Sequence, residues 1–411
     1  MTDLCHTQSL ISIDQALKNI SSALSTLTGD EMLSLHTAKD RVLSVGCTAP
    51  IDLPTFANSA MDGYAFNSAD IQSSDFDLLQ IGISWAGRPF KKTLKRGQCV
   101  RIFTGAVLPN GADSVIMQEQ VEISDVTIHF PTNTQAQQHT RSVGEDVRQH
   151  DCLLPAGKQL TAIDLGLLAS AGIYQVQVKR KIRIAFFSTG DELRPVGSQL
   201  SEGQIYDSNR YTLAALLDNP CYQVSDLGVV ADNKAMISQC LSQAAQSHDV
   251  VITSGGASVG DADYIKQILD EIGQVALWKL AIKPGKPLAF GHIQGCYFFG
   301  LPGNPISVLA TFQQIVTPAL RQLSGLTNNT PIRFQAICNS NLYKQAGRQE
   351  FQRGVLSQTD AGEFEVISAG KQGSNILSAS SRANCYIILA QAQGDVIPGE
   401  SVLVEPFNLF L

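Results

Sequence analysis

Four glycine-containing turns of this chain carry hydroxyl, carboxylate or ammonium groups, and each follows an apolar segment of the strand type. The turns span residues 188–192, 254–261, 283–287 and 301–305. Glycine lets backbone N–H groups approach an oxyanion closely, and such clustered donors form anion-binding concavities. The grouping predicts a site that captures a phosphate-bearing substrate.

The turn at 254–261 combines three glycines with serines, which is more than a simple chain reversal requires. Asp261 and Asp263 could hold a cation beside the bound anion, although acidic residues at a helix start would also explain them. The same segment matches the G-x-S-x-G nucleophile elbow around Ser258, so a serine hydrolase is an alternative. Ser254 and Gly255 separate the strand from that motif, which disfavours the elbow.

Three lysines surround the third turn, at positions 279, 283 and 286. Residues that alternate along a strand share a face, so we expect Lys279 and Lys283 to point together toward an anion. In the fourth turn, Pro302 and Pro305 fix the backbone at the start of a helix, where free N–H groups attract anions.

Composition excludes several classes of function. A net charge of −7 without a dense basic run argues against nucleic-acid binding. Nine cysteines without a C-x-x-C pair fit reduced thiols in the cytoplasm, and seven histidines show no zinc spacing. No stretch of 18 apolar residues is present, so we expect no membrane span. Carboxylate-held magnesium remains compatible with the sequence.

Hydrophobic periodicity predicts several modules. Apolar residues from Ile13 to Leu27 predict an amphipathic helix, with Ser12 and Gln15 in the form of a capping box. Residues 45–148 are typical of short strands. Strand and helix patterns alternate over 182–323, which favours a mainly parallel sheet whose strand exits hold the four turns. Short strands return after residue 326.

These features, taken in order, resemble the MoeA and gephyrin E-domain family of molybdopterin molybdenumtransferases over nearly the whole chain. The serine-glycine turn alone also occurs in molybdopterin adenylyltransferases and competence-damage-type proteins. Two departures are Ala257, where valine is commoner, and a segment at 149–151 without the usual glycine. The motifs lie at residues 59–65, 102–105, 144–146, 188–193, 203–209, 254–261, 283–287 and 301–305.

The resemblance implies a multidomain α/β plus β fold. It assigns a three-layer α/β molybdopterin-binding domain to 179–326, on which a helix at 1–26 packs. A linker domain covers 27–45 and 147–178, a β-rich domain 46–146, and a C-terminal β-barrel 327–411. The implied reaction converts adenylylated molybdopterin and molybdate to molybdenum cofactor and AMP, with Mg²⁺ assisting.

Residue roles follow from matching positions. Asp62, Thr104, Glu192, Asp232 and Asp263 are implied to be catalytic, and the last three to hold the metal. Lys279, Lys283, Arg353 and Ser374 are expected around molybdate. The remaining expected substrate-binding residues are Ser188, Thr189, Gly190, Asp191, Ser254, Gly255, Gly256, Ser258, Gly285, Lys286, Pro302, Gly303, Asn304 and Pro305.

The family forms elongated homodimers, so Asp62 and Thr104 are expected to reach the site from another subunit. A molybdopterin adenylyltransferase and molybdoenzyme apoproteins or their chaperones are the implied partners. A gephyrin-like scaffold is the main non-enzymatic alternative. Carboxylates and lysines beside phosphate-type turns favour the enzyme, because a pure binding module needs no such set.

Overall fold

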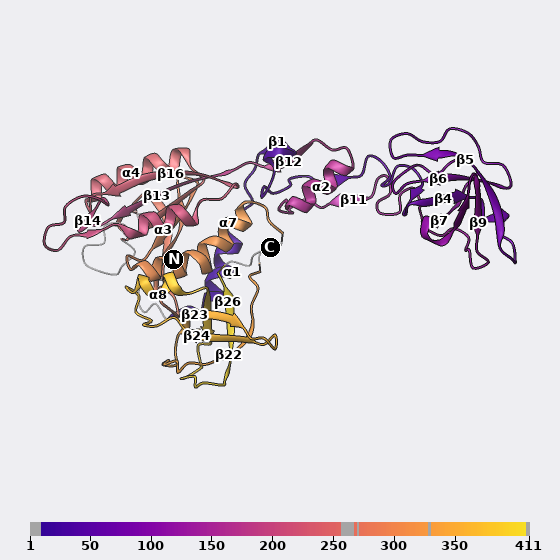
Figure 1. The fold of residues 1–411 in the computed structure, drawn as a ribbon. Coiled ribbons are helices and arrows are strands. Elements are labelled where there is room, and N and C mark those ends of the chain that lie inside the picture. Colours follow the sequence, from indigo (N-terminus) through magenta and orange to yellow (C-terminus); the bar gives the residue numbers. More distant parts are fainter. Residues whose placement is uncertain (1–9, 256–266, 269–270, 328–329, 408–411) are drawn as a thin grey trace.

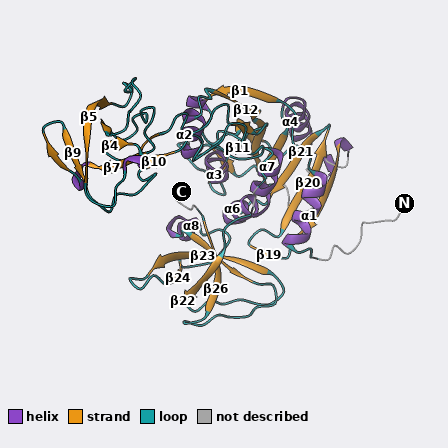
Figure 2. Cartoon of the chain, turned by 90° about the vertical axis from the view of Figure 1, so that its right-hand side faces the viewer, coloured by secondary structure: helices purple, strands orange, loops and turns teal. Residues whose placement is uncertain are grey.

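The computed structural model describes residues 10–255, 267–268, 271–327 and 330–407. The molecule is elongated, as Figure 1 shows. A β-rich module lies at one end and is joined by a slender linker to a body that contains the α/β module and the C-terminal module. In Figure 2 the strands of the C-terminal module spread beneath helices α6 and α8.

The α/β module is built on a six-stranded mixed sheet. Three of the pairings between neighbouring strands are parallel and two are antiparallel. The sheet is therefore mainly parallel, as predicted, and has antiparallel strands at one edge. The strand order is β16 (Tyr222–Val230), β13 (Ile182–Thr189), β17 (Val250–Ser254), β21 (Cys296–Leu301), β20 (Pro287–Ile293) and β18 (Gly273–Lys279).

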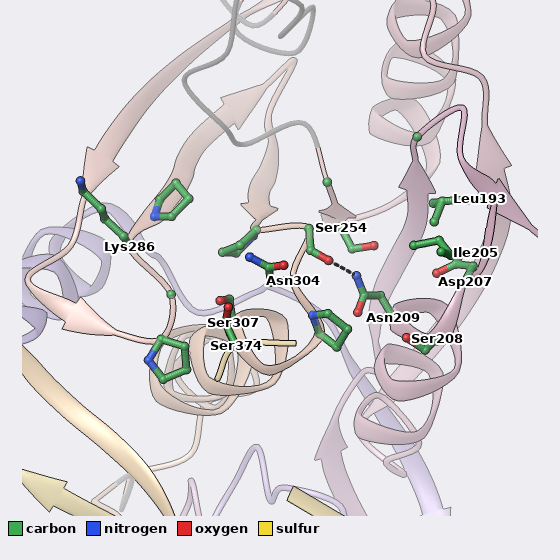
Figure 3. A pocket seen from close by; sticks show the side chains of 18 of the residues that line it. Leu193, Ile205, Asp207, Ser208, Asn209, Ser254, Lys286, Asn304, Ser307 and Ser374 are labelled. Atoms are coloured by element: carbon green, nitrogen blue, oxygen red, sulfur yellow. Dashed lines mark hydrogen bonds between the residues drawn. The ribbon is translucent and has the colours of Figure 1, made fainter. Parts of the chain in front are cut away.

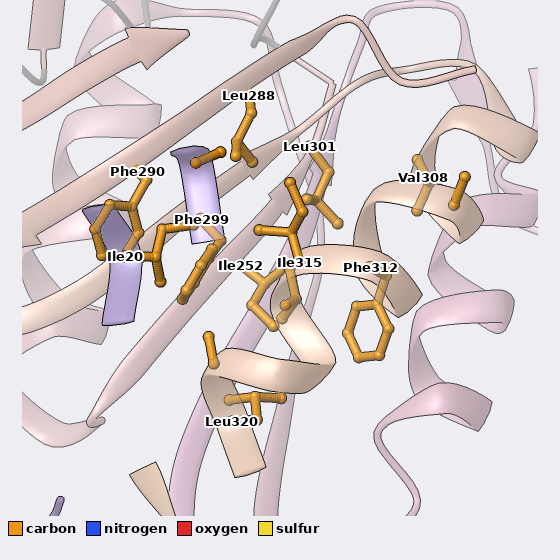
Figure 4. Packing of buried hydrophobic residues seen from close by; sticks show 14 of the residues in the cluster. Ile20, Ile252, Leu288, Phe290, Phe299, Leu301, Val308, Phe312, Ile315 and Leu320 are labelled. Atoms are coloured by element: carbon orange, nitrogen blue, oxygen red, sulfur yellow. The ribbon is translucent and has the colours of Figure 1, made fainter. Parts of the chain in front are cut away.

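Helices cover both faces of this sheet, which confirms the three-layer arrangement. One buried cluster joins Ile252 and Phe299 of the sheet to Ile20 and Leu320 of the covering helices (Figure 4). A second cluster packs Ile237 and other α4 residues on the opposite face. The helical segments are α1 (Ile13–Ala23), α3 (Ser208–Leu216), α4 (Lys234–Ser247), α6 (Pro305–Thr311), the π-helical η4 (Phe312–Val316) and α7 (Thr317–Leu323).

Helix α1 begins as predicted but ends earlier. The Ser12 side chain accepts a hydrogen bond from the Gln15 N–H at 3.2 Å. The Gln15 side chain bonds Asn19 at 2.7 Å instead of returning to Ser12, so only half of the predicted capping box forms. The helix ends at Ala23, and Leu27 lies beyond it.

The linker module consists of small strand pairs around α2 (Ala162–Ser170), whose start Thr161 and Asp164 cap reciprocally. Its side chains form a separate buried cluster that includes Leu43 and Leu168. The pairs are β1 (Asp30–Ser34) with β12 (Gln175–Lys179) and β2 (Cys47–Thr48) with β11 (Cys152–Leu154); η1 covers Leu35–Thr37.

The β-rich module holds a six-stranded sheet and a further pair, β3 (Asn58–Ser59) with β10 (Thr140–Arg141). Its core includes stacked aromatic rings of Phe76 and Phe130. The sheet order is β7 (Ser114–Met117), β4 (Gly63–Phe66), β6 (Gln98–Ile102), β5 (Phe76–Ser84), β9 (Thr127–Phe130) and β8 (Glu122–Ser124), with 3-10 turns η2 (Ser68–Asp70) and η3 (Gln118–Gln120).

The C-terminal module is a closed five-stranded barrel, as expected, because β23 pairs with both β24 and β25. Its Phe351 and Tyr386 belong to the same buried cluster as the α/β core, so the two modules share one interior. The barrel elements are β22 (Phe334–Cys338), β23 (Gln349–Gln358), β24 (Phe364–Ser368), α8 (Leu377–Arg382), β25 (Cys385–Leu389) and β26 (Ser401–Pro406).

One predicted strand divides into two. Lys279 and Lys283, which we expected on one strand, lie on two: β18 ends at Lys279, and β19 (Ile282–Lys283) pairs with β23 of the barrel. No helix in the described part of the chain is long and apolar enough to cross a membrane.

Candidate active site

A cavity of about 620 Å³ lies where strands β13, β17 and β21 end. Parallel strands place their carboxyl ends at one edge of a sheet, where ligands of α/β folds bind. All four glycine turns contribute to its wall (Figure 3). From the expected set they supply Thr189, Gly190, Glu192, Ser254, Gly255, Lys283, Gly285, Lys286, Pro302, Gly303, Asn304 and Pro305, and Asp232 and Ser374 join them.

The first two turns are fastened to each other. Ser188 and Ser254 are buried, and their hydroxyl oxygens lie 2.9 Å apart. Gly255 has φ +89°, and a Cβ atom there would approach the Thr189 carbonyl oxygen to 2.6 Å. Glycine is therefore required for the close approach of the two turns. Ser188 fixes this contact and does not line the cavity.

Acidic groups gather on one side of the cavity. The Asp232 N–H donates to Asp191 Oδ1 at 3.3 Å. Burial raises the pKa of Asp232, and the negative charges of Asp191 and Glu192 raise it further. A carboxyl group whose pKa is raised in this way binds a proton or a metal ion more readily, because either one relieves the repulsion between the neighbouring carboxylates.

Glu192 and Asp232 face the cavity with oxygen donors suited to magnesium. Among the described residues, no group of three or more His, Cys, Asp or Glu side chains is arranged to hold a metal ion. The pair therefore fits Mg²⁺ when phosphate oxygens or water supply the remaining ligands, as is usual for this ion. The third expected ligand, Asp263, lies outside the described residues.

Cationic groups also line the cavity. Lys283, Lys286 and Arg348 line the cavity and also a second, adjoining cavity of about 830 Å³ toward the barrel. Lys283 Nζ donates to Glu350 Oε1 at 3.1 Å, which anchors the turn to strand β23. Arg348 is not among the site residues predicted from the sequence, because nothing in its local pattern indicates that the barrel contacts this turn.

The expected role of Lys279 at the site is not supported. Lys279 does not line either cavity, and its carbonyl oxygen accepts a hydrogen bond from the Ile11 N–H at 3.0 Å. The prediction that Lys279 and Lys283 share a face was wrong because they lie in strands of different sheets. The alternation rule holds only within one strand.

Arg353 also differs from the expectation. Its side chain is 1% exposed and donates from Nη2 to the carbonyl oxygens of Lys371 and Gly373 at 3.2 and 3.1 Å. These bonds hold the loop that brings Gln372 and Ser374 to the cavity. Arg353 therefore positions this part of the cavity wall and does not line the cavity itself.

The segment that leads into α3 supplies lining residues that the sequence reasoning did not assign. Asn209 Nδ2 donates to the Gly303 carbonyl oxygen at 2.7 Å (Figure 3). This bond joins the helix start to the fourth turn. The motif at 203–209 was the available signal, but its chemistry is visible only once α3 meets that turn. The unassigned lining residues of this segment are Ile205, Tyr206, Asp207, Ser208 and Asn209, and Leu193, which pairs with Ile205, also lines the cavity.

Asp62 and Thr104 lie in the β-rich module, away from the cavity (Figure 1). The Thr104 N–H and hydroxyl both donate to Asp62 Oδ1, at 2.7 and 2.8 Å. These bonds lower the pKa of Asp62, and the positive charge of Arg101 adds to the effect. A single copy of the chain does not bring this ionised carboxylate to the four turns.

Three expected site residues, Gly256, Ser258 and Asp263, lie outside the described residues. The hydrolase alternative depends on the first two of them.

Comparisons with known proteins identify the family of this chain. Residues 11–172 match the MoeA N-terminal region (domains I and II), residues 185–322 a probable molybdopterin binding domain, and residues 335–407 the MoeA C-terminal region (domain IV). A molybdopterin molybdenumtransferase of Haemophilus influenzae is 45% identical and covers 98% of this chain and 100% of its own length.

A molybdopterin molybdenumtransferase of a Nostoc species is 35% identical over 94% of this chain and 91% of its own length. A crystal structure of the molybdopterin biosynthesis protein MoeA from Pyrococcus horikoshii superposes with a TM-score of 0.86 at 27% identity, covering 97% of this chain and all of that one. The chain therefore belongs to the MoeA family of molybdopterin molybdenumtransferases.

Proposed function

We propose that this chain inserts molybdenum from molybdate into adenylylated molybdopterin and releases AMP, as a step of molybdenum cofactor biosynthesis. The observation that supports this proposal most strongly is a single cavity lined by carboxylates, by lysine and arginine side chains and by the glycine turns. A substrate with two linked phosphates and an incoming oxyanion needs this combination of groups.

The groups that line the cavity have different roles in this proposal. The N–H groups of the glycine turns bind phosphoryl oxygens, and Lys283 and Lys286 stabilise negative charge that develops as the anhydride breaks. Arg348 and Ser374 complete the anion-binding side toward the barrel, where molybdate enters. Glu192 and Asp232 hold Mg²⁺, which polarises a phosphoryl oxygen when it is bound.

The overall reaction balances without an external oxidant. Water attacks one phosphorus atom of the phosphoanhydride, the bridging P–O bond breaks, and AMP leaves. The two dithiolene thiols form S–Mo bonds, and their two protons leave with one oxygen atom of molybdate as a single water molecule. Molybdenum therefore keeps its oxidation state, and molybdate acts as a substrate.

We also propose a homodimer in which the β-rich module of one subunit brings Asp62 and Thr104 to the cavity of the other. The separation of these residues from the cavity within one chain supports this arrangement. A cytoplasmic location is in keeping with the eight cysteines of the described residues, all of which are free thiols. A molybdopterin adenylyltransferase upstream and molybdoenzyme apoproteins or chaperones downstream complete the proposal.

The test is AMP release by the purified protein from adenylylated molybdopterin with Mg²⁺, with and without molybdate. Molybdate-dependent release together with formed cofactor supports the proposal. A folded protein that releases no AMP and forms no cofactor under both conditions overturns it. Omission of Mg²⁺, followed by its return, tests the metal requirement separately.

A further inference from the structure

Several chemical groups meet at one edge of the sheet in the β-rich module. Gly63 pairs with Met117 on one side and with Ile102 on the other, and Ile102 pairs with Ser84. The next residue outward on each strand therefore lies in one row along the sheet edge. That row is Gln118, Asp62, Phe103 and Trp85, with Thr104 following Phe103.

Two aromatic rings of this row are stacked. The rings of Trp85 and Phe103 have centroids 4.1 Å apart and planes inclined by 11°. The Arg101 guanidinium lies 4.8 Å from the Phe103 ring and 5.2 Å from the Tyr64 ring. The rings and the guanidinium thus form a column that ends at Trp85.

Hydrogen bonds of Arg101 and of the Trp85 backbone hold this column in place. Arg101 donates to the Gly63 carbonyl oxygen at 2.8 Å and also to the Gln118 side chain. The backbone groups of Trp85 and Arg88 exchange two hydrogen bonds, at 3.1 and 2.9 Å, which fixes Trp85 at the start of a tight turn. A ring held in this way loses little conformational entropy when a ligand binds to it.

Trp85 nevertheless remains 48% exposed. A single exposed apolar side chain is common on protein surfaces. This one differs because it completes a fixed stack and shares a sheet edge with the Asp62–Thr104 pair. Trp85 and Asp62 lie two strands apart, which is about 10 Å. A substrate that carries an aromatic ring and a phosphate can span that separation.

We propose that Trp85 is a stacking platform for a planar heteroaromatic ring of the adenylylated substrate, and that it presents the phosphate end of that substrate to Asp62. The inference rests on the proposed function, because it takes this substrate from it. Adenine and pterin share the required chemistry, namely a flat polarisable ring with polar edges. Stacking on an aromatic side chain tolerates either ring and strengthens binding by roughly 5- to 100-fold.

The binding test uses tryptophan fluorescence. The chain contains two tryptophans, so Trp278→Phe leaves Trp85 as the single emitter. AMP and a phosphorylated pterin without adenine are titrated separately into this variant. Saturable quenching by AMP assigns the adenine ring to Trp85, and quenching by the pterin assigns the pterin ring. No saturable quenching by either compound overturns the proposal.

The kinetic test compares two substitutions at Trp85. Trp85→Leu removes the aromatic face and is expected to raise the KM for adenylylated molybdopterin by about 5- to 100-fold with a small change in kcat. Trp85→Phe retains a ring and is expected to stay within about three-fold of the parent protein. Circular dichroism checks that both variants are folded.

Two results of the kinetic test contradict the platform. An unchanged KM in folded Trp85→Leu shows that no ring stacks there. A loss of dimer in Trp85→Leu, seen by sedimentation, with parent KM in the dimer that remains, shows that Trp85 is an interface residue. Failure of the proposed function is distinguishable, because the parent protein then releases no AMP while the quenching measurement still reports ring binding.

Discussion

Thr104 donates two hydrogen bonds to one and the same oxygen of Asp62, from its backbone N–H at 2.7 Å and from its hydroxyl at 2.8 Å. Both bonds favour the charged form of the carboxyl and lower its pKa. Asp62 is therefore ionised at neutral pH although it lies at a sheet edge beside aromatic side chains. This geometry suits a group that holds a fixed negative charge and orients water during turnover.

Asp62→Asn is expected to reduce AMP release by about 100-fold or more, because the amide keeps the shape and lacks the negative charge that orients water. The free energy of unfolding is expected to change by less than about 0.5 kcal/mol, since the side chain is exposed. Single-turnover AMP release and urea unfolding measure the two effects. Asp125→Asn, at another exposed position of the same module, is the matched control. Undiminished AMP release by Asp62→Asn contradicts the role.

Thr104→Val removes the hydroxyl bond and keeps the backbone bond, so the pKa of Asp62 is expected to rise from its lowered position. Activity that requires ionised Asp62 is lost as the pH falls through that pKa. The rate profile is measured at saturating Mg²⁺, so that bound metal prevents the raised pKa of Asp232 from setting the acid limb. Under that condition the acid limb is expected to move to higher pH in the variant. A profile that keeps the position of its acid limb shows that Asp62 does not control it.

The raised pKa of Asp232 gives a metal-dependent prediction. Burial and the charges of Asp191 and Glu192 favour protonated Asp232, so metal must displace a proton at low pH. Raising the Mg²⁺ concentration is expected to shift the acid limb of kcat/KM to lower pH. Asp191→Asn removes one repelling charge and is expected to shift it in the same direction at low Mg²⁺. A limb that does not respond to Mg²⁺ excludes Asp232 as a ligand.

Gly255 and Gly295 form a matched pair, because both have φ +89° and only Gly255 has a close neighbour. Alanine at either position costs about 1–2 kcal/mol for the backbone conformation. Gly255→Ala also meets the Thr189 carbonyl oxygen, which adds about 1–3 kcal/mol. Urea unfolding is expected to show the larger loss for Gly255→Ala, together with weaker AMP binding. Equal losses in the two variants show that the contact with Thr189 relaxes freely.

Substitutions at Lys283 and Lys286 distinguish the contribution of a lysine to stability from its contribution to AMP binding. Lys283→Met leaves Glu350, which is 4% exposed, without its cation and is expected to lower the free energy of unfolding by about 1–3 kcal/mol. Lys286 has no ion pair among the described side chains, so Lys286→Met is expected to leave stability nearly unchanged. Both variants are expected to bind AMP about ten-fold more weakly. Parent-like AMP affinity in both shows that the phosphate lies elsewhere.

Local pattern was sufficient to predict the parts of the fold that depend on neighbouring residues. The α/β alternation and the turns at strand ends follow from periodicity and glycine placement, so the sequence alone predicts Ser254, Gly303 and Asn304 at the site. Their convergence is a consequence of parallel strands that share one edge.

Local sequence patterns did not predict the contacts that depend on the tertiary structure. Arg353 matched the expected pattern of a ligand, yet it is buried and holds a loop through two carbonyl oxygens. Arg348 reaches the cavity because β19 pairs with the barrel strand β23. The hydrophobic periodicity of neither segment predicts this pairing. Trp85 and Phe103 meet because strands β5 and β6, whose paired residues are 18 or 19 positions apart in sequence, lie in parallel register. Their stack therefore also required the tertiary structure.

The proposed exchange of Asp62 between subunits is testable by mixing two inactive variants. Asp62→Asn and Glu192→Gln alter different modules of the chain. In a heterodimer of the two, one site carries both substitutions and the other carries neither, because each site draws one group from each subunit. Heterodimers purified through two different tags are therefore expected to recover about half of the parent rate of AMP release.

Glu192→Gln mixed with Asp232→Asn provides the control, since both residues line the same cavity of one chain. In that heterodimer each site keeps one defect, so no recovery is expected. Recovery in the control with none in the first pair would assign the groups in the opposite way. Absence of recovery in verified Asp62→Asn and Glu192→Gln heterodimers would mean that Asp62 acts within its own chain, which requires the linker module to fold the β-rich module back onto the cavity.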